Sequence, residues 1–492
     1  MSDQTEDGPV AHPGVLFFGS CVALVATSVA FATVGAVMFS MKGTFGLSNA
    51  EVGWIGGAGL WGFAVTQLVF SPLCDTLGMR FLLRLAFACH LAGTLIMIVA
   101  AGFWSLFAGA LVIAMGNGLV EAACNPLVTA LYPNNKTVKL NQFHVWFPGG
   151  IVIGGLATYA LDLLGVTSWQ LKLSLILIPT ILYGVLLLGK RFPQTEGVQS
   201  GVSMGAMFRA TLLTPLMLLM LFAMALTASV ELGPNRWVPA VLQAGGMAGI
   251  LVLVWITGLM AVLRFFAGPL VHRYSPTGVL LASAVVSGIG LYALSYAQSG
   301  VAAMASATVF AVGVTYFWPT MLGFVSERVP RSGALGLGLM GAIGMATVGL
   351  ITSPWMGGIA DRHSHDRLPV EATLAVMEEA ASFAPEGTIS PDAIAAAQSA
   401  RSVIVAYNGT GELPEGETAA AFRTIISSGV ESPAVERAGE ILQPADNYGG
   451  RVSFRRLVPM CFILAIIFGG LYYTDRRSGG YRIKHISEID EV

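Results

Sequence analysis

A single carboxylate stands in the middle of a long apolar run. Glu121 lies within Gly116–Pro126, a segment whose other residues are small, apolar or amides. Ionisable side chains inside a bilayer-spanning helix are costly, and by default they mark function. Pro126 has no N–H to donate to the carbonyl of Ala122, so the helix should loosen one turn after the carboxylate. We predict that Glu121 binds and releases a proton; the alternative is a structural carboxylate satisfied by a neighbouring helix.

Polar side chains also open the next apolar run, where Asn141, Gln142 and His144 fall within four residues. An imidazole changes its charge near neutral pH. The two amides offer both hydrogen-bond donors and acceptors. We predict His144 as a second proton-linked group and the amides as ligands of a polar solute. A histidine that only makes a structural hydrogen bond near a helix end is the alternative.

A second intramembrane carboxylate, Glu231, is followed by the pair Gly233-Pro234 in a run that is long for a single crossing. The pair is expected to break the helix, and discontinuous helices usually line binding sites. Glu231 is therefore a further proton-linked candidate, unless it forms a structural ion pair with Arg236. Arg264, near the end of its own run, is expected to extend to the membrane surface.

Aromatic side chains gather before a proline in Tyr316-Phe317-Trp318-Pro319-Thr320. Ring faces beside amides suit sugars, whose C–H faces pack on rings while their hydroxyls need hydrogen bonds. We predict that Tyr316 and Trp318 contact a solute, although an aromatic packing cluster explains them equally well. The same argument makes candidates of Trp61, Trp146 and Trp237.

The composition determines what kind of element positions these residues. Of 492 residues, 55% are hydrophobic and 11% charged, whereas soluble domains carry about 25% charged residues. A soluble globular protein and a disordered chain are both excluded. About 20 apolar residues cross a bilayer as a helix, and twelve runs of the sequence satisfy this length. They lie at approximately 15–40, 52–74, 81–103, 105–131, 142–165, 169–189, 211–243, 246–271, 278–298, 301–325, 333–356 and 456–473.

Polar segments divide the chain into seven parts: a tail (1–13), a six-helix bundle (14–190), a linker (191–208), helices seven to eleven (209–356), an insert (357–452), helix twelve (453–474) and a second tail (475–492). Lys and Arg gather in alternate short loops, which predicts a multi-pass protein of the cell (inner or plasma) membrane with both termini cytoplasmic. The insert would then lie outside. Short helices are predicted within it at Val370–Ala384, Pro391–Tyr407 and Glu417–Ser428.

Several function classes find no support. The net charge of −2 gives no nucleic-acid signal. The sequence contains no phosphate-binding glycine loop and no catalytic Ser/His/Asp or Cys/His set. The five cysteines form no paired pattern. We expect neither an enzyme nor a bound metal or cofactor.

Two predicted turns of the chain have similar sequences. Ser71-Pro72-Leu73-Cys74-Asp75 precedes Gly78 and Arg80 after the second run, and Gly268-Pro269-Leu270-Val271-His272-Arg273 occupies the matching place in the second half. This arrangement resembles the major facilitator superfamily. The resemblance implies two six-helix bundles built of inverted 3+3 repeats. It also implies that Asp75, Gly78, Arg80, Gly268 and Arg273 form a conformational latch.

A closer resemblance lies around 116–150. A Glu four residues before Asn-Pro, followed by Leu-Asn-x-x-His, is similar to the fucose/galactose/glucose:proton symporters, as is Glu231 before Gly and Trp237. The resemblance implies that Glu121 is the proton-linked carboxylate. It also implies that Asn125, Asn141 and His144 lie near the sugar path.

Together these observations predict an all-α membrane transporter that works by alternating access, in the lipid bilayer and as a monomer. Its expected partners are a monosaccharide and protons, with no nucleic acid. Two alternatives remain open: a carrier of another small solute, such as an organic anion or a drug, and a transporter-like receptor that uses the insert 357–452.

Overall fold

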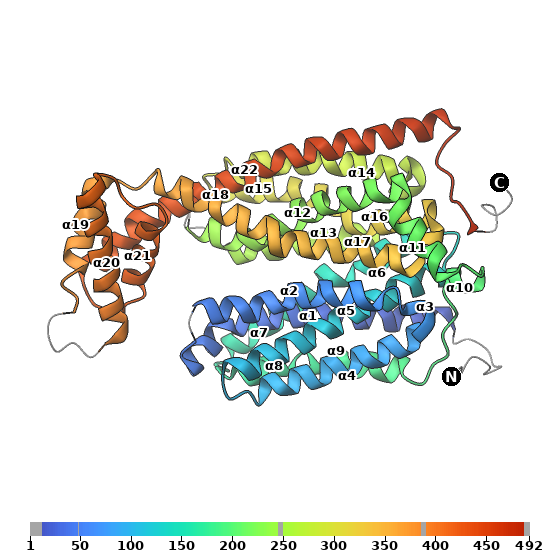
Figure 1. The fold of residues 1–492 in the computed structure, drawn as a ribbon, viewed down its shortest axis with the longest axis horizontal. Helices are drawn as coiled ribbons and strands as arrows, with labels where there is room; N and C mark the ends of the chain where they lie inside the picture. Colours follow the sequence, from blue (N-terminus) through green and yellow to red (C-terminus); the bar gives the residue numbers. More distant parts are fainter. Residues whose placement is uncertain (1–11, 48, 245–248, 385–389, 487–492) are drawn as a thin grey trace.

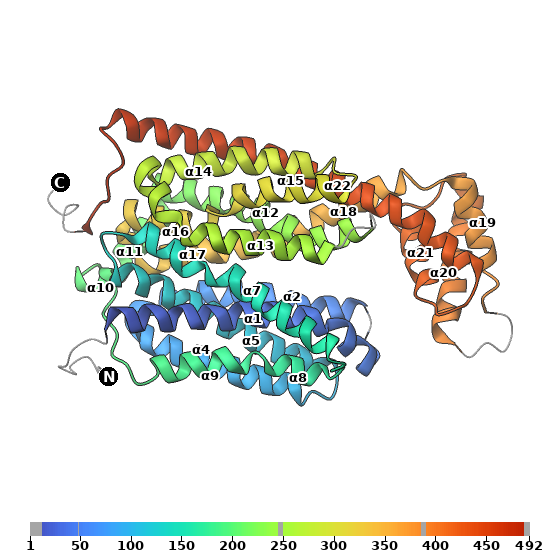
Figure 2. The same cartoon turned by 180° about the vertical axis from the view of Figure 1, so that it is seen from behind.

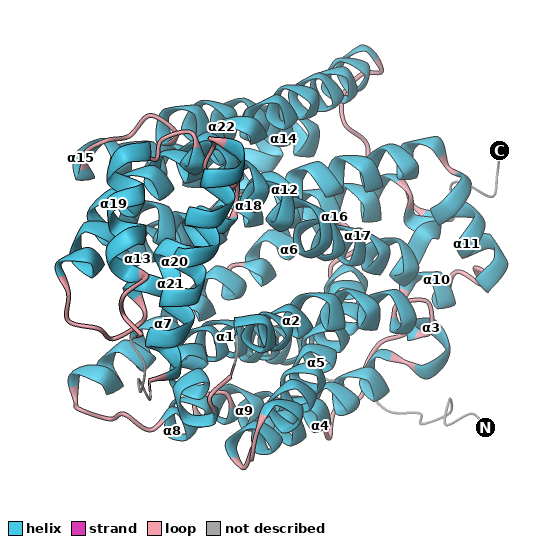
Figure 3. Cartoon of the chain, turned by 60° about the vertical axis from the view of Figure 1, so that its left-hand side comes forward, coloured by secondary structure: helices cyan, strands magenta, loops and turns pink. Residues whose placement is uncertain are grey.

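The computed structural model describes residues 12–47, 49–244, 249–384 and 390–486. Within these residues every regular element is a helix, as Figure 3 shows. Both termini lie at one end of the molecule, and the predicted insert projects from the other (Figure 1). We call these the termini end and the insert end.

The first half of the chain forms one bundle of helices, the lower layer in Figure 1. Its elements are α1 (Pro13–Phe45), α2 (Asn49–Phe70), α3 (Cys74–Leu77), α4 (Met79–Ile98), α5 (Phe103–Leu131), α6 (Lys136–His144), α7 (Trp146–Leu163), α8 (Trp169–Ser174) and α9 (Leu177–Leu187). Two short helices, α10 (Glu196–Gln199) and α11 (Met204–Leu213), lead to the second half at the termini end.

The second half forms the other bundle, the upper layer in Figure 1. Its elements are α12 (Pro215–Ala244), α13 (Gly249–Phe265), α14 (Ala267–Leu294), α15 (Gly300–Val314), α16 (Phe317–Arg328), η1 (Pro330–Ser332), α17 (Gly333–Thr347), the π-helical turn η2 (Val348–Thr352), α18 (Ser353–His365) and α22 (Pro433–Arg477). A large apolar core connects the packed helices of both halves.

Eleven helices of the described chain are long and apolar enough to cross a bilayer. The remaining predicted run, 246–271, contains α13, whose apolar part is shorter. This agrees with the predicted two bundles of six crossings. Five runs are interrupted helices rather than straight ones. Their breaks are at Val145 between α6 and α7, near Leu175 between α8 and α9, at Phe266 between α13 and α14, near Thr315 between α15 and α16, and at the π turn η2.

The two bundles approach closely where α2 meets α17. A Cβ atom on Gly338 would lie on the hydroxyl of Ser71, and one on Gly341 would meet the amide of Gln67. Glycine is required where two backbones come this close. Because Gln67 and Ser71 end α2 beside α3, this contact joins the bundles toward the termini end.

The insert folds around its own apolar core. It consists of α19 (Val370–Ala380), α20 (Pro391–Thr410), α21 (Glu417–Ile426) and the first turns of α22. The predicted short helices are present at these places. Ser390 and Ser432 cap α20 and α22 by accepting hydrogen bonds from backbone N–H groups, as expected of N-cap serines.

The insert is continuous with the bundle rather than joined by a loop. The boundary expected at residue 453 falls inside α22, which runs from the insert through the second bundle to the termini end (Figure 2). Pro444 and Pro459 lie within this helix without ending it. Arg423 of α21 contacts Asp361 of α18 at 3.6 Å and Asp446 of α22 at 3.0 Å. The insert is thus braced to two helices of the second bundle.

Glu379 links α19 to the start of α22. It accepts hydrogen bonds from Ser432 Oγ at 2.8 Å and from the backbone N–H of Ala434 at 3.2 Å, and it pairs with Arg437. The hydrogen bond from Ser432, aided by Arg437, lowers the pKa of this carboxyl below its ordinary value. A depressed folded-state pKa contributes stability above the unfolded-state value, and this stability is lost as the pH falls through the folded-state value.

We therefore expect Glu379→Gln to speed amide exchange at residues 432–437 at neutral pH. The difference from wild type should vanish once the pH falls below the depressed pKa, because both side chains are then neutral. Hydrogen–deuterium exchange on the full-length protein measures this effect. Glu378→Gln, a neighbouring exposed carboxylate, is the matched control; equal exchange in both variants would contradict the role of Glu379.

Candidate functional site

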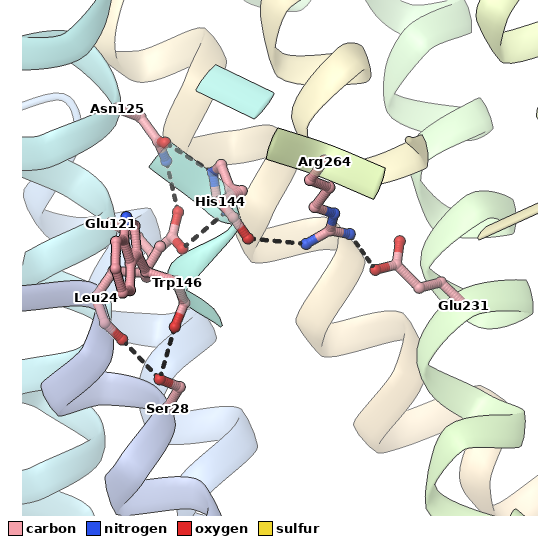
Figure 4. Close-up of polar contacts among 8 residues, drawn as sticks. All are labelled: Leu24, Ser28, Glu121, Asn125, His144, Trp146, Glu231 and Arg264. Atoms are coloured by element: carbon pink, nitrogen blue, oxygen red, sulfur yellow. Dashed lines mark hydrogen bonds and ion pairs between the residues drawn. The ribbon is translucent and has the colours of Figure 1, made fainter. Parts of the chain in front are cut away.

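Three of the predicted residues, carried by α5 and α6, meet on the side of the first bundle that faces Arg264 of the second (Figure 4). Asn125 Nδ2 donates to Glu121 Oε2 at 2.6 Å, and His144 Nε2 donates to Asn125 Oδ1 at 3.1 Å. His144 Nδ1 lies 3.9 Å from Glu121 Oε1. All three side chains are buried. If Nε2 carries the hydrogen of the bond to Asn125, then Nδ1 and Oε1 face each other with room for one proton between them.

Arg264 extends this network across to the second bundle. Its NH1 donates to the backbone oxygen of His144 at 3.1 Å, and its NH2 donates to Glu231 Oε1 at 2.8 Å. Its Nε donates to the backbone oxygen of Thr315 at 2.6 Å. The side chain is only 2% exposed. The prediction that Arg264 reaches the membrane surface is wrong, because carbonyl and carboxylate partners hold its guanidinium inside.

Prolines explain why both carbonyls are available. The oxygen of His144 would accept from residue 148 in a continuous helix, and that of Thr315 from residue 319. Both positions are proline, Pro148 and Pro319, which have no N–H. A carbonyl left without a partner in an apolar interior is costly. Arg264 donates a hydrogen bond to one such carbonyl in each bundle. The two helix breaks and the arginine therefore stabilise one another.

Glu231 does not lie at a helix break. The helix α12 continues from Pro215 to Ala244 through Gly233-Pro234, so the predicted interruption is wrong. A methyl group on Gly233 would contact Thr352 and Met356 of the second bundle, and this tight packing supports the helix past the proline. The partner of Glu231 is Arg264; the side chain of Arg236 lies outside the described residues.

The two predicted amides of α6 have different surroundings. Asn141 is buried and donates to Thr320 Oγ1 of α16 at 3.1 Å, while its Oδ1 has no hydrogen-bond partner among the described residues. It therefore lies between the bundles. Gln142 instead accepts from Lys139 of its own helix at 3.0 Å, away from the Glu121 network.

Additional contacts between the bundles were missed from the sequence. Lys136 is fully buried; it pairs with Glu196 and donates to the backbone oxygen of Ser326 at 3.2 Å. Glu327 of α16 accepts from the backbone N–H of Thr137 at 2.9 Å. These residues flank loops in the sequence, where charges are ordinarily solvated, so no pattern distinguished them.

Two of the aromatic candidates are buried in the second bundle. The hydroxyl of Tyr316 donates to the backbone oxygen of Leu263 at 3.1 Å, beside Arg264. Trp318 packs near Gly344 of α17 and Ala228 of α12. They line the second-bundle side of the Arg264 cluster.

The other tryptophans lie elsewhere. Trp61 packs on Phe107 within the first bundle at 6.2 Å between ring centroids, and Trp237 packs beside Gly357 of α18. Trp146 borders an apolar cavity of about 320 Å³ among α1, α7 and α9, which adjoin one another in Figure 2. Its backbone oxygen accepts from Ser28 at 3.1 Å.

The predicted latch residues occupy the termini end of both bundles. Asp75 accepts from Thr195 Oγ1 of the linker at 2.6 Å, and burial raises its pKa. Gly78 has a φ of +81°, a conformation that favours glycine. Arg80 Nε is buried, and no described residue forms a hydrogen bond with it. Gly268 lies near Val138 of the first bundle, and Arg273 is exposed over the ring of Tyr274 at 5.4 Å. Asp75 thus holds the linker rather than an arginine.

The fold and the network define a class: two bundles of membrane-spanning helices with charged side chains joined across their interface. The Major Facilitator Superfamily model matches residues 16–354. The chain belongs to this family, whose members are transporters and not enzymes.

Individual relatives are more distant. The D-xylose-proton symporter-like 1 protein of Arabidopsis thaliana is 26% identical over 167 residues, which is 33% of this chain and 32% of the relative. The aligned segment thus spans about a third of that relative's length. The structure of the E. coli fucose:proton symporter FucP aligns with a TM-score of 0.57 at 18% identity, covering 70% of this chain and 92% of FucP. A bacterial homologue of the human lysosomal transporter Spinster, inward-facing and unoccupied, aligns with a TM-score of 0.60 at 16% identity over 95% and 98% of the two chains.

The contrast between Asn125 and Trp146 gives a direct test of the site. Asn125→Ala removes the bridge between Glu121 and His144 and leaves buried groups without partners, which costs about 1–3 kcal/mol. We expect solute uptake to fall about tenfold or more. Trp146→Phe changes only the border of the apolar cavity and should leave uptake within about twofold of wild type. Initial uptake rates in proteoliposomes, normalised to inserted protein, measure both variants. A larger loss of uptake in Trp146→Phe than in Asn125→Ala would exclude this site.

Proposed function

We propose that the protein is a secondary active transporter that moves a monosaccharide together with protons by alternating access. The observation that carries this proposal is the buried Glu121–Asn125–His144 network, which ends on an arginine from the other bundle. A proton acceptor at this place is buried within the membrane-spanning part of the protein, and it is connected through His144 to an arginine of the other bundle. The sugar and proton named for two of the relatives support the same assignment.

In this proposal Glu121 and His144 hold the transported proton. With the proton bound at Oε1 or Nδ1, the Glu121–His144 pair has no net charge. With the proton removed, the pair has one negative charge. Removing the proton leaves a carboxylate near the Arg264 guanidinium, and buried opposite charges attract strongly. The protonation state therefore changes how firmly the two bundles are held together at Arg264. Coupling of a proton to movement of the bundles follows from this difference.

The sugar would bind between the bundles toward Asn141, Tyr316 and Trp318. Asn141 Oδ1 is a buried acceptor to which no residue of the described ranges donates, and a sugar hydroxyl would satisfy it. Ring faces in the same region suit the C–H faces of a pyranose. Gln142, Trp61, Trp146 and Trp237 lie away from this cluster, and we do not assign them to the sugar.

We propose further that the termini end faces the cytoplasm of a cell (inner or plasma) membrane. Lys and Arg are concentrated in the short loops at this end. The hydrogen bonds from Lys136, Thr137 and Asn141 to α16 join the bundles there. The described conformation is then the one closed on the cytoplasmic side. Because a single chain supplies both bundles, we expect the monomer to be the functional unit.

The experiment is uptake into proteoliposomes with an imposed pH gradient, acid outside, for a panel of radiolabelled monosaccharides, organic anions and cationic drugs. The proposal predicts accumulation of at least one monosaccharide only while the gradient lasts. Accumulation of an organic anion or a drug in place of every sugar would establish the other-solute alternative. The receptor alternative predicts that removing residues 366–432 leaves transport intact and abolishes a signalling output.

A further inference from the structure

A polar cavity lies at the termini end, outside the network just described. Its volume is about 430 Å³, within the range of small-molecule sites. One wall is the turn between α5 and α6 in the first bundle, including Asn134 and Asn135. The other walls come from the second bundle: the segment of α14 around His272 and Arg273, and the end of α22 around Arg476.

The backbone shapes the second-bundle wall. The helix α14 is kinked at Ser275, whose φ of 64° and ψ of 161° are not helical. The kink separates the segment containing His272 and Arg273 from the membrane-spanning part of α14. Both side chains are exposed at the mouth of the cavity, which is accessible from the termini end.

The two acids of the cavity are already satisfied. Glu327 accepts from the N–H of Thr137 at 2.9 Å and from the hydroxyl of Tyr481 at 2.6 Å. Burial and the neighbouring Glu327 raise the pKa of Tyr481 well above its ordinary value, so this hydroxyl stays a donor. Asp475 pairs with Arg328 and accepts from Thr277 at 2.9 Å.

The basic side chains of the cavity are not matched by acids. Within the described chain, neither Arg273 nor His272 forms a hydrogen bond or an ion pair, and the Arg273 guanidinium lies over the ring of Tyr274. Arg476 donates to the hydroxyl of Tyr472 at 2.9 and 2.7 Å and forms no ion pair in the same residues. The cavity therefore presents two guanidinium groups, an imidazole and two amides, while Asp475 is paired with Arg328 and both oxygens of Glu327 are occupied by neutral donors.

From this arrangement we infer a binding site for a phosphate group. Guanidinium groups bind phosphate oxygens by charge-assisted hydrogen bonds, in pairs where the geometry allows. The amides of Asn134 and Asn135 supply neutral donors from the opposite wall. The phosphate group belongs either to a small soluble phosphate ester or to the headgroup of an anionic lipid at the membrane surface.

Occupancy of this site would act on the conformation. Because its walls come from both bundles, a bound phosphate stabilises the arrangement in which the termini ends are together. A ligand that binds one conformation more tightly shifts the population toward it. The site is therefore inhibitory, and it is distinct from the Glu121–Arg264 network. Its test requires no transport and so stands independently of the proposed function.

The test compares Arg273→Gln/Arg476→Gln with wild type as purified full-length protein. Thermal unfolding is followed with inorganic pyrophosphate against sodium chloride at equal ionic strength, and in nanodiscs of phosphatidylcholine with or without phosphatidylglycerol. Arg477→Gln, an exposed arginine on the same helix outside the cavity, is the matched control.

We expect an increase in unfolding temperature in wild type and Arg477→Gln that the double variant loses, with at least about a tenfold weaker apparent affinity for two lost charged contacts. A response to pyrophosphate indicates a soluble phosphate compound as the ligand; a response only to phosphatidylglycerol indicates a lipid headgroup. Equal responses of the double variant and Arg477→Gln to both probes would overturn the site. Hydrogen exchange tests the link between bundles: the ligand should slow exchange at 132–137 as well as at 272–276. Protection of the second segment alone would refute the conformational role.

Discussion

Glu121→Gln is expected to abolish proton-driven accumulation while leaving the solute site able to bind. Gln keeps the size of Glu121 and can still hydrogen-bond to Asn125, but it cannot bind and release a proton. One coupled proton supplies about 1.4 kcal/mol per unit of pH gradient, which supports about tenfold accumulation. In the variant the accumulation ratio should fall to about one at any gradient. Uptake into proteoliposomes, measured to steady state at several gradients, gives this ratio.

Two controls distinguish lost coupling from lost folding. Solute counterflow without a gradient should persist in Glu121→Gln, because exchange requires binding and movement of the bundles but no net proton transfer. Asp162→Asn removes a half-exposed carboxylate of the same bundle that pairs with Lys172, and it should keep wild-type accumulation. Gradient-dependent accumulation by Glu121→Gln would show that another group carries the proton.

Arg264→Met is expected to destabilise the protein more than any other single change named here. The substitution leaves Glu231 as a buried carboxylate without its cation, and two backbone carbonyls without a donor. Breaking a buried ion pair by removing one partner costs about 3–5 kcal/mol. We expect a large fall in the thermal unfolding temperature of the detergent-solubilised protein, together with loss of uptake.

A double-mutant cycle separates the charge from the carbonyl contacts. Glu231→Gln/Arg264→Met removes both charges and should recover much of the lost stability. Uptake should remain low, because the contact between Arg264 and the His144 carbonyl that joins the bundles is still absent. Arg264→Lys keeps the charge but has no planar fork to reach three partners, so it should retain stability better than activity. Full activity in Arg264→Met would rule out the cross-bundle role.

The positions of Glu121, Asn125 and His144 show which contacts of the site the local sequence pattern predicts and which it does not. Glu121 and Asn125 are four residues apart, and side chains at this spacing share a helix face, so their contact follows from the sequence once the helix is assigned. His144 belongs to another helix. Its approach to Asn125 depends on the packing of α6 against α5, which periodicity does not supply. The resemblance around 116–150 implied only that both residues lie near the sugar path.

Arg264 shows why the contacts between distant parts of the chain could not be predicted from the sequence. A basic residue near a helix end usually extends to the membrane surface, and the sequence around Arg264 contains nothing that opposes this interpretation. Its actual partners are the carbonyls of His144 and Thr315 and the carboxylate of Glu231, from three separate parts of the chain. The absence of an N–H at Pro148 and Pro319 can be read from the sequence. That both freed carbonyls lie beside one arginine depends on tertiary packing.

The helix that carries Glu231 shows that tertiary packing can override a local helix-breaking signal. Gly233-Pro234 is a strong local signal for interruption, yet α12 passes through it, because packing against η2 and α18 outweighs the loss of one backbone hydrogen bond. Tertiary contacts of this kind are stronger than the local preference of a dipeptide.

The sequence by itself determined the class of the protein. Few charges, many apolar runs of bilayer length and a polar insert permit little other than a multi-helix membrane protein, because backbone groups in the apolar phase must be hydrogen-bonded within helices and charges are costly there. It also identified the carboxylates and amides that cost most to bury. Tertiary structure alone decided which of these residues meet across separate helices, which tryptophans face apolar surroundings, and that one buried arginine joins the bundles. Hydrophobic periodicity specifies which face of a helix is buried, but a partner side chain is specified only when separate helices are packed in register.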